Sequence, residues 1–285
     1  MESQTIIQYT IKEIESFRHQ VSNRLPLNVY NKIISYQPQK RSRYSKVHEK
    51  QNKFFLRNAE KMDTEKLELT VKSIITPILN KVTNENYDKL IPKLNELVEL
   101  KVNKDCKTRI HSLLMSLLLK KVLSEGFFCS VYANLLKDLY DKIEIDYIEY
   151  LDNLLVDLNN INNKTLTKDY NTKNYDVFCE QLKDKDNYVN LFIFIGELYS
   201  KKMIEYILIK KYLYTLFDTI LKCNIENSLT LEINALSIKN LLLKCHDKNF
   251  YQIVYPKFEE MKNNKQYKSK FRFILMDIID NYNNM

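Results

Sequence analysis

Residues 64–82, TEKLELTVKSIITPILNKV, decide the fold class of this chain. The apolar residues in this stretch are Leu67, Leu69, Val71, Ile74, Ile75, Ile78, Leu79 and Val82. They recur mostly at i, i+3, i+4 and i+7, which is the spacing of one face of an α-helix. Asp63 and Thr64 are suitable N-caps, because their side-chain oxygens can accept hydrogen bonds from the first turn. Pro77 lies inside the pattern and is expected to kink the helix or mark its weak point.

The same periodicity returns along the rest of the chain. The further helical segments are 87–100, 109–123, 127–140, 147–158, 175–182, 189–221 with a break near Ser200, 229–246, 251–262 and 270–281. Residues 159–174 are polar and Asn-rich, which predicts a long internal loop. The 285 residues include only 2 Gly and 5 Pro, the residues that usually punctuate sheets and tight turns. The sequence therefore predicts an all-α fold of about ten helices.

These segments form successive antiparallel pairs of roughly 40 residues, the period of helical repeats. One pair cannot bury its apolar face alone, whereas stacked pairs share a continuous core. We therefore expect residues 62–285 to form a right-handed α-solenoid of about five antiparallel hairpins, similar to HEAT repeats. An irregular bundle of helices is the alternative, because the pairs share little sequence identity.

Residues 1–61 lack this regularity, apart from a short helical pattern at 11–25, and we expect them to form a flexible arm. The whole chain carries a net charge of +8, and residues 37–61 hold eight basic residues against Glu49 and Glu60, a net charge of +6. A local basic segment is the usual footprint of a polyanion partner. The candidate RNA contacts are Lys40, Arg41, Arg43, Lys46, Lys50, Lys53 and Arg57. A solvated linker is the alternative.

Several classes of protein are disfavoured by what the sequence lacks. The beginning, MESQTIIQYT, does not resemble a secretory signal, and the apolar run 189–198 is shorter than the roughly 18 to 20 residues that span a bilayer. The five cysteines are an odd number without a close metal-ligand spacing, which favours a reducing compartment. We therefore expect a cytoplasmic protein with no membrane contact.

Catalytic patterns are also missing. The chain has too few glycines for a phosphate-binding loop, and its four histidines lie far apart in the sequence. His111 lies in an apolar segment and is expected to be a core residue. Cys129 has no identifiable base and is expected to be a buried thiol. We therefore expect no enzymatic activity, no metal and no cofactor.

Four stretches, taken in order, point to a known family. They are 78–90 (ILNKVTNENYDKL), 124–134 (SEGFFCSVYAN), 194–203 (FIGELYSKKM) and 269–280 (SKFRFILMDIID). They resemble the motifs ILNKLTPxxF, SEPxFSxxYAN, FIGELFxxKM and SRIRFMLxDVIDLR of the middle domain of eukaryotic translation initiation factor 4-gamma. The resemblance covers roughly residues 65–285. The chain's bias toward Lys, Asn and Ile is typical of AT-rich genomes, such as those of protists and large DNA viruses.

This resemblance implies stacked helical hairpins that dock a DEAD-box RNA helicase of the initiation factor 4A type and bind RNA. The helicase-contacting positions of the first motif correspond to Leu79, Val82 and Tyr87. These three could equally be core residues. Arg272 fills the arginine of the closing motif and could simply pair with Asp277 or Asp280. Two departures stand out: Gly126 replaces a proline, which is expected to loosen the turn, and the ending DNYNNM lacks a tryptophan that contacts the helicase in the family.

The segment around Tyr9 resembles the ligand pattern Y-x4-L-Φ of the cap-binding protein, initiation factor 4E. Tyr9 and Ile14 fill two of its positions, Glu15 stands where an apolar residue is expected, and Phe17 could supply that contact. Such a ligand folds into a short amphipathic helix on a groove. A generic helix that packs on the rest of the chain is the alternative.

Taken together, the motifs predict a translation initiation scaffold whose partners are the helicase, mRNA bound without sequence preference, and the cap-binding protein. Two alternatives remain open at this point. One is a related adaptor that holds another DEAD-box helicase in mRNA processing, decay or translational repression. The other is a helical-repeat structural protein without a helicase partner.

Overall fold

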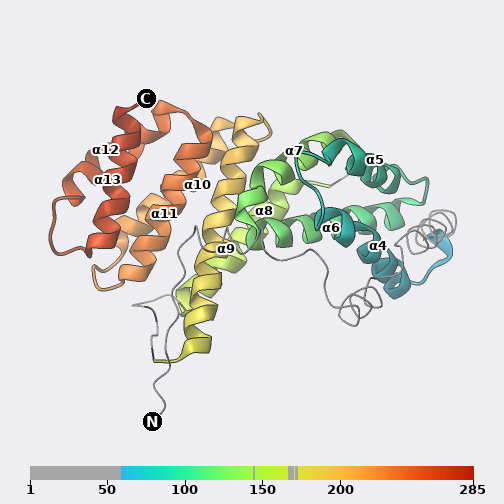
Figure 1. The fold of residues 1–285 in the computed structure, drawn as a ribbon, viewed down its shortest axis with the longest axis horizontal. Coiled ribbons are helices and arrows are strands. Elements are labelled where there is room, and N and C mark those ends of the chain that lie inside the picture. Colours follow the sequence, from blue (N-terminus) through green and yellow to red (C-terminus); the bar gives the residue numbers. More distant parts are fainter. Residues whose placement is uncertain (1–58, 144, 166–169, 171–172) are drawn as a thin grey trace, which may run out of the picture. The chain divides into compact units, whose positions relative to one another are not determined.

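The computed structural model describes residues 59–143, 145–165, 170 and 173–285 (Figure 1). Every described residue belongs to one compact unit, Phe55–Met285. The predicted contacts of Tyr9, Ile14 and Phe17 and of the seven basic residues between Lys40 and Arg57 lie outside the described residues.

The described residues are all-α, as predicted. Their ten α-helices are α4 (Thr64–Leu79), α5 (Tyr87–Val98), α6 (Lys104–Ser124), α7 (Cys129–Leu139), α8 (Tyr147–Thr165), α9 (Tyr175–Ser200), α10 (Tyr206–Lys222), α11 (Ser228–Cys245), α12 (Lys248–Met261) and α13 (Ser269–Asn283). Three single-turn 3-10 helices accompany them, η1 (Ala59–Lys61), η2 (Gly126–Phe128) and η3 (Tyr140–Lys142). No helix among these residues is both long and apolar enough to cross a membrane.

Polar residues between the helices act as N-caps. The Asp63 carboxylate accepts a hydrogen bond from the Lys66 amide at 2.8 Å, which confirms the predicted start of α4. Asn103 accepts from the Cys106 amide at 2.9 Å, and Asn174 accepts from two amides at the start of α9. These bonds satisfy amides that have no partner within their own helix. The Pro77 ring does not stop α4, which continues to Leu79.

Two of the predicted boundaries were wrong. Residues 159–165 continue α8, although the Asn-rich segment was expected to be a loop. The low helix propensity of Asn is overridden there, since Asn159 accepts a hydrogen bond from the Tyr188 hydroxyl of α9 at 2.9 Å. Helix α9 is also continuous through residues 183–188, where we expected a break. Gln181 and Tyr188 are both buried, two turns apart on one face, so the charged residues between them stay on the solvent side.

Helix α9 is central to the packing. Figure 1 shows it between the helices α4–α8 and the helices α10–α13. It packs against α6, α7 and α8 on one side and makes the most extensive helix pair of the described chain with α11 on the other. The helices α4, α6, α9, α11 and α13 pack in succession, each against the next. The buried apolar side chains therefore form one continuous cluster from Ala59 to Ile279.

The contact between α9 and α11 depends on Gly196. A Cβ atom at this position would lie 2.5 Å from the Cβ of Lys244 and 3.1 Å from the carbonyl oxygen of Leu241. The first distance is shorter than two carbon atoms tolerate, and neither neighbour is the free end of a flexible side chain. Gly196 therefore sets how closely the two helices approach.

Gly196→Ala is expected to destabilise the protein by about 1–3 kcal/mol, because the added methyl group forces α9 and α11 apart. Urea unfolding followed by circular dichroism measures this as a lower midpoint. Thr219→Ala on the exposed side of α10 is a suitable control and should change the free energy of unfolding by less than about 0.5 kcal/mol. Equal stability of Gly196→Ala and the wild type would contradict the close approach.

Candidate protein-docking surface

The first motif forms the turn between α4 and α5. Asn86 holds this turn: its side-chain oxygen accepts from the Thr83 amide at 2.8 Å, and its side-chain nitrogen donates to the Lys81 carbonyl at 2.6 Å. The Val82 amide also donates to the carbonyl of Ile78 at 3.0 Å. The sequence TNEN at 83–86 is therefore a fixed turn with satisfied polar groups.

The three predicted helicase contacts occupy different environments. Leu79 is only 2% exposed and Val82 only 3%. Tyr87 is half-buried, and its hydroxyl donates to the Asp138 carboxylate of α7 at 2.8 Å. Burial and the neighbouring Asp138 raise the pKa of Tyr87 well above its usual value, so the phenol stays protonated and neutral. Of the three side chains, Tyr87 alone offers substantial surface to a partner.

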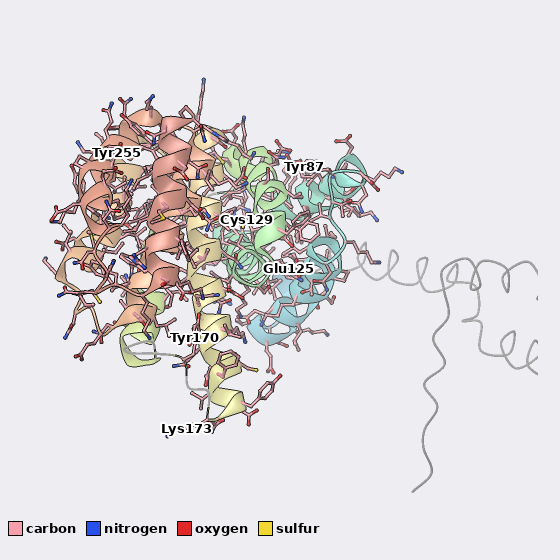
Figure 2. The ribbon with its side chains drawn as sticks, turned by 60° about the vertical axis from the view of Figure 1, so that its left-hand side comes forward. Tyr87, Glu125, Cys129, Tyr170, Lys173 and Tyr255 are labelled. Carbon is pink, nitrogen blue, oxygen red and sulfur yellow. The ribbon has the colours of Figure 1, made fainter. Side chains whose placement is uncertain are left out.

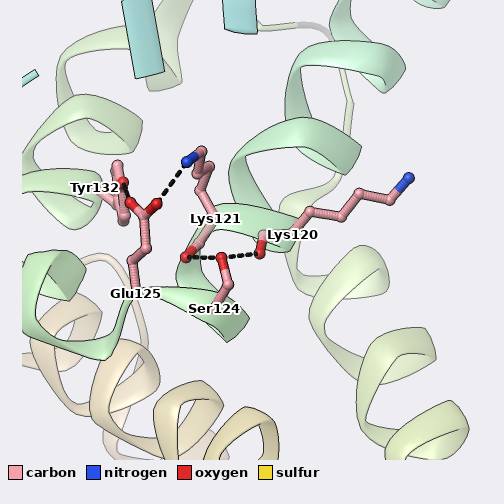
Figure 3. Close-up of polar contacts among 5 residues, drawn as sticks. All are labelled: Lys120, Lys121, Ser124, Glu125 and Tyr132. Carbon is pink, nitrogen blue, oxygen red and sulfur yellow. Dashed lines mark hydrogen bonds and ion pairs between the residues drawn. The ribbon is translucent and has the colours of Figure 1, made fainter. Parts of the chain in front are cut away.

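The second motif turns the chain from α6 into α7 through η2. Glu125 receives hydrogen bonds from the Lys121 ammonium group, at 2.5 Å, and from the Tyr132 hydroxyl (Figure 3). Burial opposes charge on the Glu125 carboxylate, but these two donors outweigh it and lower its pKa. The Ser124 hydroxyl donates back to carbonyls of the last turn of α6. The end of α6 is therefore fixed by side chains of α6 itself and by Tyr132 of α7.

Gly126 leaves room at this turn for a side chain of another helix. The side chain of Asn190 on α9 lies against it and donates to the carbonyl of Leu123 at 2.7 Å, which caps the end of α6. A Cβ at residue 126 would lie 2.0 Å from the side-chain oxygen of Asn190. The missing side chain thus makes room for a bond between α9 and the carboxyl end of α6.

The tertiary structure brings the first two motifs together at one small cavity. Leu79 of the first motif and Ser124 of the second both line it, although they are separated by about 45 positions in the sequence. Its volume is about 140 Å³, and its other lining residues are Thr76, Leu117, Lys120 and Lys121. Leu79 and Leu117 give the cavity an apolar wall, and the exposed Lys120 gives its edge a positive charge.

Phe127, which follows directly in η2, was not predicted as a site residue. Its side chain is 93% exposed, the largest exposure of any big apolar side chain in the described residues. Phe128 beside it packs partly into the core, with the two rings edge to face at 5.3 Å. The family motif leaves the position of Phe127 unspecified, so the resemblance gave no signal for it. A large exposed aromatic ring is typical of an anchor for protein binding.

The first half of the third motif lies in the core. All five residues of Phe194–Leu198 are buried. The Glu197 carboxylate lies 2.8 Å from the Lys244 ammonium group and 3.7 Å from that of Lys201. Burial, together with the charge of Glu197, raises the pKa of the Cys129 thiol to about 12. Cys129 therefore stays protonated at neutral pH and is a poor nucleophile.

Helix α9 ends in a Schellman motif, which explains the break that we expected near Ser200. The Met203 amide donates to the Leu198 carbonyl at 2.9 Å, and the Lys202 amide donates to the Tyr199 carbonyl at 2.8 Å. Lys202 itself has a φ of 62°, the left-handed region that favours glycine. The Met203 carbonyl then accepts from the Tyr147 hydroxyl, which fixes the first turn of α8.

Lys202→Gly is expected to stabilise the protein by about 0.5–1 kcal/mol, because glycine adopts a positive φ without the steric cost that lysine has there. Thermal unfolding followed by calorimetry should show a higher midpoint. Lys201→Gly is the matched control, since Lys201 has a φ of −91° and should not benefit. A lower midpoint for Lys202→Gly would show that the lysine side chain matters more than the backbone.

Packing also shows the surroundings of His111 and Arg272. His111 is fully buried, and its Nε2 lies 3.1 Å from the Val98 carbonyl oxygen, so it is a core histidine as expected. Arg272 donates to the Ser269 hydroxyl at 3.4 Å, whereas Asp277 pairs with Lys239 of α11 at 2.6 Å.

Figure 2 shows Tyr170 and Lys173 beside the beginning of α9, away from Tyr87 and Glu125. Within the described ranges, no three His, Cys, Asp or Glu residues are grouped as metal ligands.

Comparison with known proteins adds no family assignment. No protein-family model matches the sequence, and no curated protein matches it. The resemblance to initiation factor 4-gamma therefore rests on the residues of the four motifs and on their order in the sequence.

Proposed function

We propose that this chain is a translation initiation scaffold that binds a DEAD-box RNA helicase of the initiation factor 4A type and RNA in the cytoplasm. The order of the four motifs across residues 65–285 is the observation that carries this proposal. We also propose that the helices form a right-handed α-solenoid of about five hairpins. The succession of α4, α6, α9, α11 and α13, each packed on the next, supports this arrangement.

For the helicase we propose the surface formed by Phe127, Lys120 and the cavity lined by Leu79. Both of the first two motifs contribute to it. Its turn is already fixed, because Asn190 donates to the Leu123 carbonyl and both Lys121 and Tyr132 donate to the Glu125 carboxylate. A surface that is ordered before binding loses little entropy in the complex. Leu79 then acts as the apolar wall of the cavity, and Phe127 as the protruding anchor.

The basic arm and the Tyr9 segment complete the proposal. The arm would hold mRNA through phosphate contacts, and Tyr9, Ile14 and Phe17 would hold the cap-binding protein. A scaffold of this kind needs no chemistry of its own. It raises the local concentration of helicase, mRNA and cap-binding protein relative to one another.

The helicase surface predicts a specific pattern of binding losses. Phe127→Ala is expected to weaken the affinity for a purified helicase of the initiation factor 4A type at least tenfold, because an aromatic anchor is lost. Adding Lys120→Glu to this variant is expected to weaken the affinity for the helicase further, because a positive charge at the edge of the cavity is replaced by a negative one. Isothermal titration calorimetry measures both. Phe273→Ala on α13, another exposed phenylalanine, is the matched control and should bind as the wild type does.

A wild-type chain that does not bind this helicase would refute the proposed function. Unchanged binding of Phe127→Ala together with Lys120→Glu would instead move the contact to another surface. Because Phe127 and Lys120 are exposed, their replacement should leave the unfolding midpoint unchanged, so a loss of binding would not reflect misfolding.

The arm predicts a strong dependence of RNA affinity on salt. Neutralising the seven arm residues to Gln should reduce the affinity for a single-stranded RNA more than tenfold at low salt. For the wild type, the slope of log K against log salt is expected to be between about −3 and −5, since each neutralised phosphate contributes about −0.7. Fluorescence anisotropy measures both quantities. A chain whose arm residues 37–57 are shuffled keeps its charge and should keep its affinity.

Two alternatives make different predictions for the same chain. A related adaptor in mRNA processing, decay or repression would bind another DEAD-box helicase and would not bind the cap-binding protein through Tyr9. A structural protein of stacked helices would bind no helicase at all. Binding measurements with the cap-binding protein and with two helicases therefore separate the three functions.

A further inference from the structure

Helix α10 has apolar residues on two opposite faces. Its buried face packs into the core through Ile209, Tyr212, Leu213, Leu216 and Ile220. Its opposite face carries Ile207, Tyr214 and Leu221, which are 75%, 47% and 46% exposed. An ordinary surface helix is polar on the side away from the core. The exposed face of α10 therefore has the composition of a face that packs against something.

The three exposed residues are spaced by seven, so they form one stripe along the helix. Seven residues make nearly two turns, and the stripe from Ile207 to Leu221 is about 21 Å long. Heptad spacing of this kind is typical of a seam between two packed helices. We name these three residues the α10 stripe.

Two oppositely charged residues lie beside the stripe, Lys211 before Tyr214 and Asp218 after it. Lys211 lies three residues before Tyr214 and Asp218 four residues after it, and both fall on one flank of the stripe, whereas Lys210 falls on the other flank. If two α10 helices pack antiparallel about a twofold axis at Tyr214, Ile207 of one faces Leu221 of the other. Lys211 of one then lies opposite Asp218 of the other, and this ion pair occurs twice.

We propose that the α10 stripe is a self-association surface that binds a second copy of this chain through an antiparallel α10–α10 contact. An isologous contact requires a patch that is complementary to itself, and the evenly spaced apolar stripe with Lys211 and Asp218 on one flank meets this requirement. A second copy is the occupant because one flank of the stripe carries both a cation and an anion, Lys211 and Asp218, which pair with each other when the stripe meets its own antiparallel image. The two Tyr214 rings meet at the axis, where aromatic pairs are favourable.

The contacts within the chain are compatible with this dimer. Lys211 already lies 3.2 Å from Asp152 of α8, and Asp218 lies 2.6 Å from Lys222. Each of these pairs is largely exposed, so it contributes little and leaves a further donor or acceptor for a second partner. Lys210 lies 5.8 Å from the centroid of the Tyr214 ring, which helps to hold that ring in place.

A single helix face is smaller than a standard protein interface, so we expect a weak dimer with a Kd on the order of 100 µM. The mass of the full chain is 34.2 kDa, and analytical ultracentrifugation should show a concentration-dependent rise toward twice this value. Ile207→Ser and Tyr214→Ser should each abolish the rise. Phe273→Ser, which removes a 61% exposed ring from α13, should leave it unchanged.

A charge exchange tests the geometry itself. Lys211→Glu and Asp218→Lys should each be monomeric alone, since each homodimer would place like charges opposite one another. An equal mixture of the two variants should dimerise. In the mixed dimer the introduced carboxylate of one chain faces the introduced ammonium group of the other, and the unchanged Asp218 faces the unchanged Lys211. A defect in the folding of either variant could not produce such a recovery.

Three results would overturn the proposal. The first is a wild-type chain that stays monomeric up to several hundred micromolar, about the limit set by the expected Kd; the stripe would then belong to a different partner. The second is dimerisation that survives Ile207→Ser and Tyr214→Ser. The third is a mixture of the two charge variants that stays monomeric while the wild type dimerises, which would exclude the antiparallel arrangement.

Discussion

The close approach of α9 and α11 at Gly196 is the constraint on which the rest of this structure depends. The absence of a side chain there lets Lys244 of α11 reach the buried Glu197 carboxylate at 2.8 Å. A buried carboxylate is costly unless it is paired, so the ion pair and the helix spacing support one another. Helix α9 also packs against α6, α7 and α8. The contact between α9 and α11 therefore connects the helices α4–α8 to the helices α10–α13.

The four motifs that suggest a function are first of all elements of the fold. Leu79, Val82 and the FIGEL residues are buried, and the SKKM segment closes α9 with a left-handed residue at Lys202. Residues of this kind specify packing and helix ends, and they fix the neighbouring exposed side chains. The proposed docking function therefore depends on the exposed side chains that the motifs position. One of these is Phe127, next to the turn in which Tyr132 donates to Glu125.

Hydrogen bonds from tyrosine to carboxylate connect elements that are distant in the sequence. Tyr87 bonds to Asp138, Tyr212 to Asp152 and Tyr199 to Asp247. In each case burial, followed by the neighbouring carboxylate, raises the pKa of the phenol above its usual value. The phenol therefore remains a donor at any physiological pH, so these ties do not respond to moderate changes of pH.

Helical periodicity was enough to predict the all-α class, because an apolar face repeats in nearly every segment of the body. It also placed the break near Ser200 and the N-cap Asp63. The predictions failed where composition and tertiary contact disagree. The Asn-rich residues 159–165 and the charged residues 183–188 look like loops, but the bond from Tyr188 to Asn159 and the buried Gln181 keep them helical.

The sequence by itself determined the helical class, the order of the motifs and the concentration of positive charge in residues 37–61, since each of these is a property of neighbours along the chain. Only the tertiary structure decided which motif residues are buried and which exposed. It brought Leu79 and Ser124 to one cavity, exposed Phe127 and left an apolar stripe on α10. The physical reason is that exposure depends on which helices pack against one another, and this choice is made by contacts such as Gly196 with Lys244.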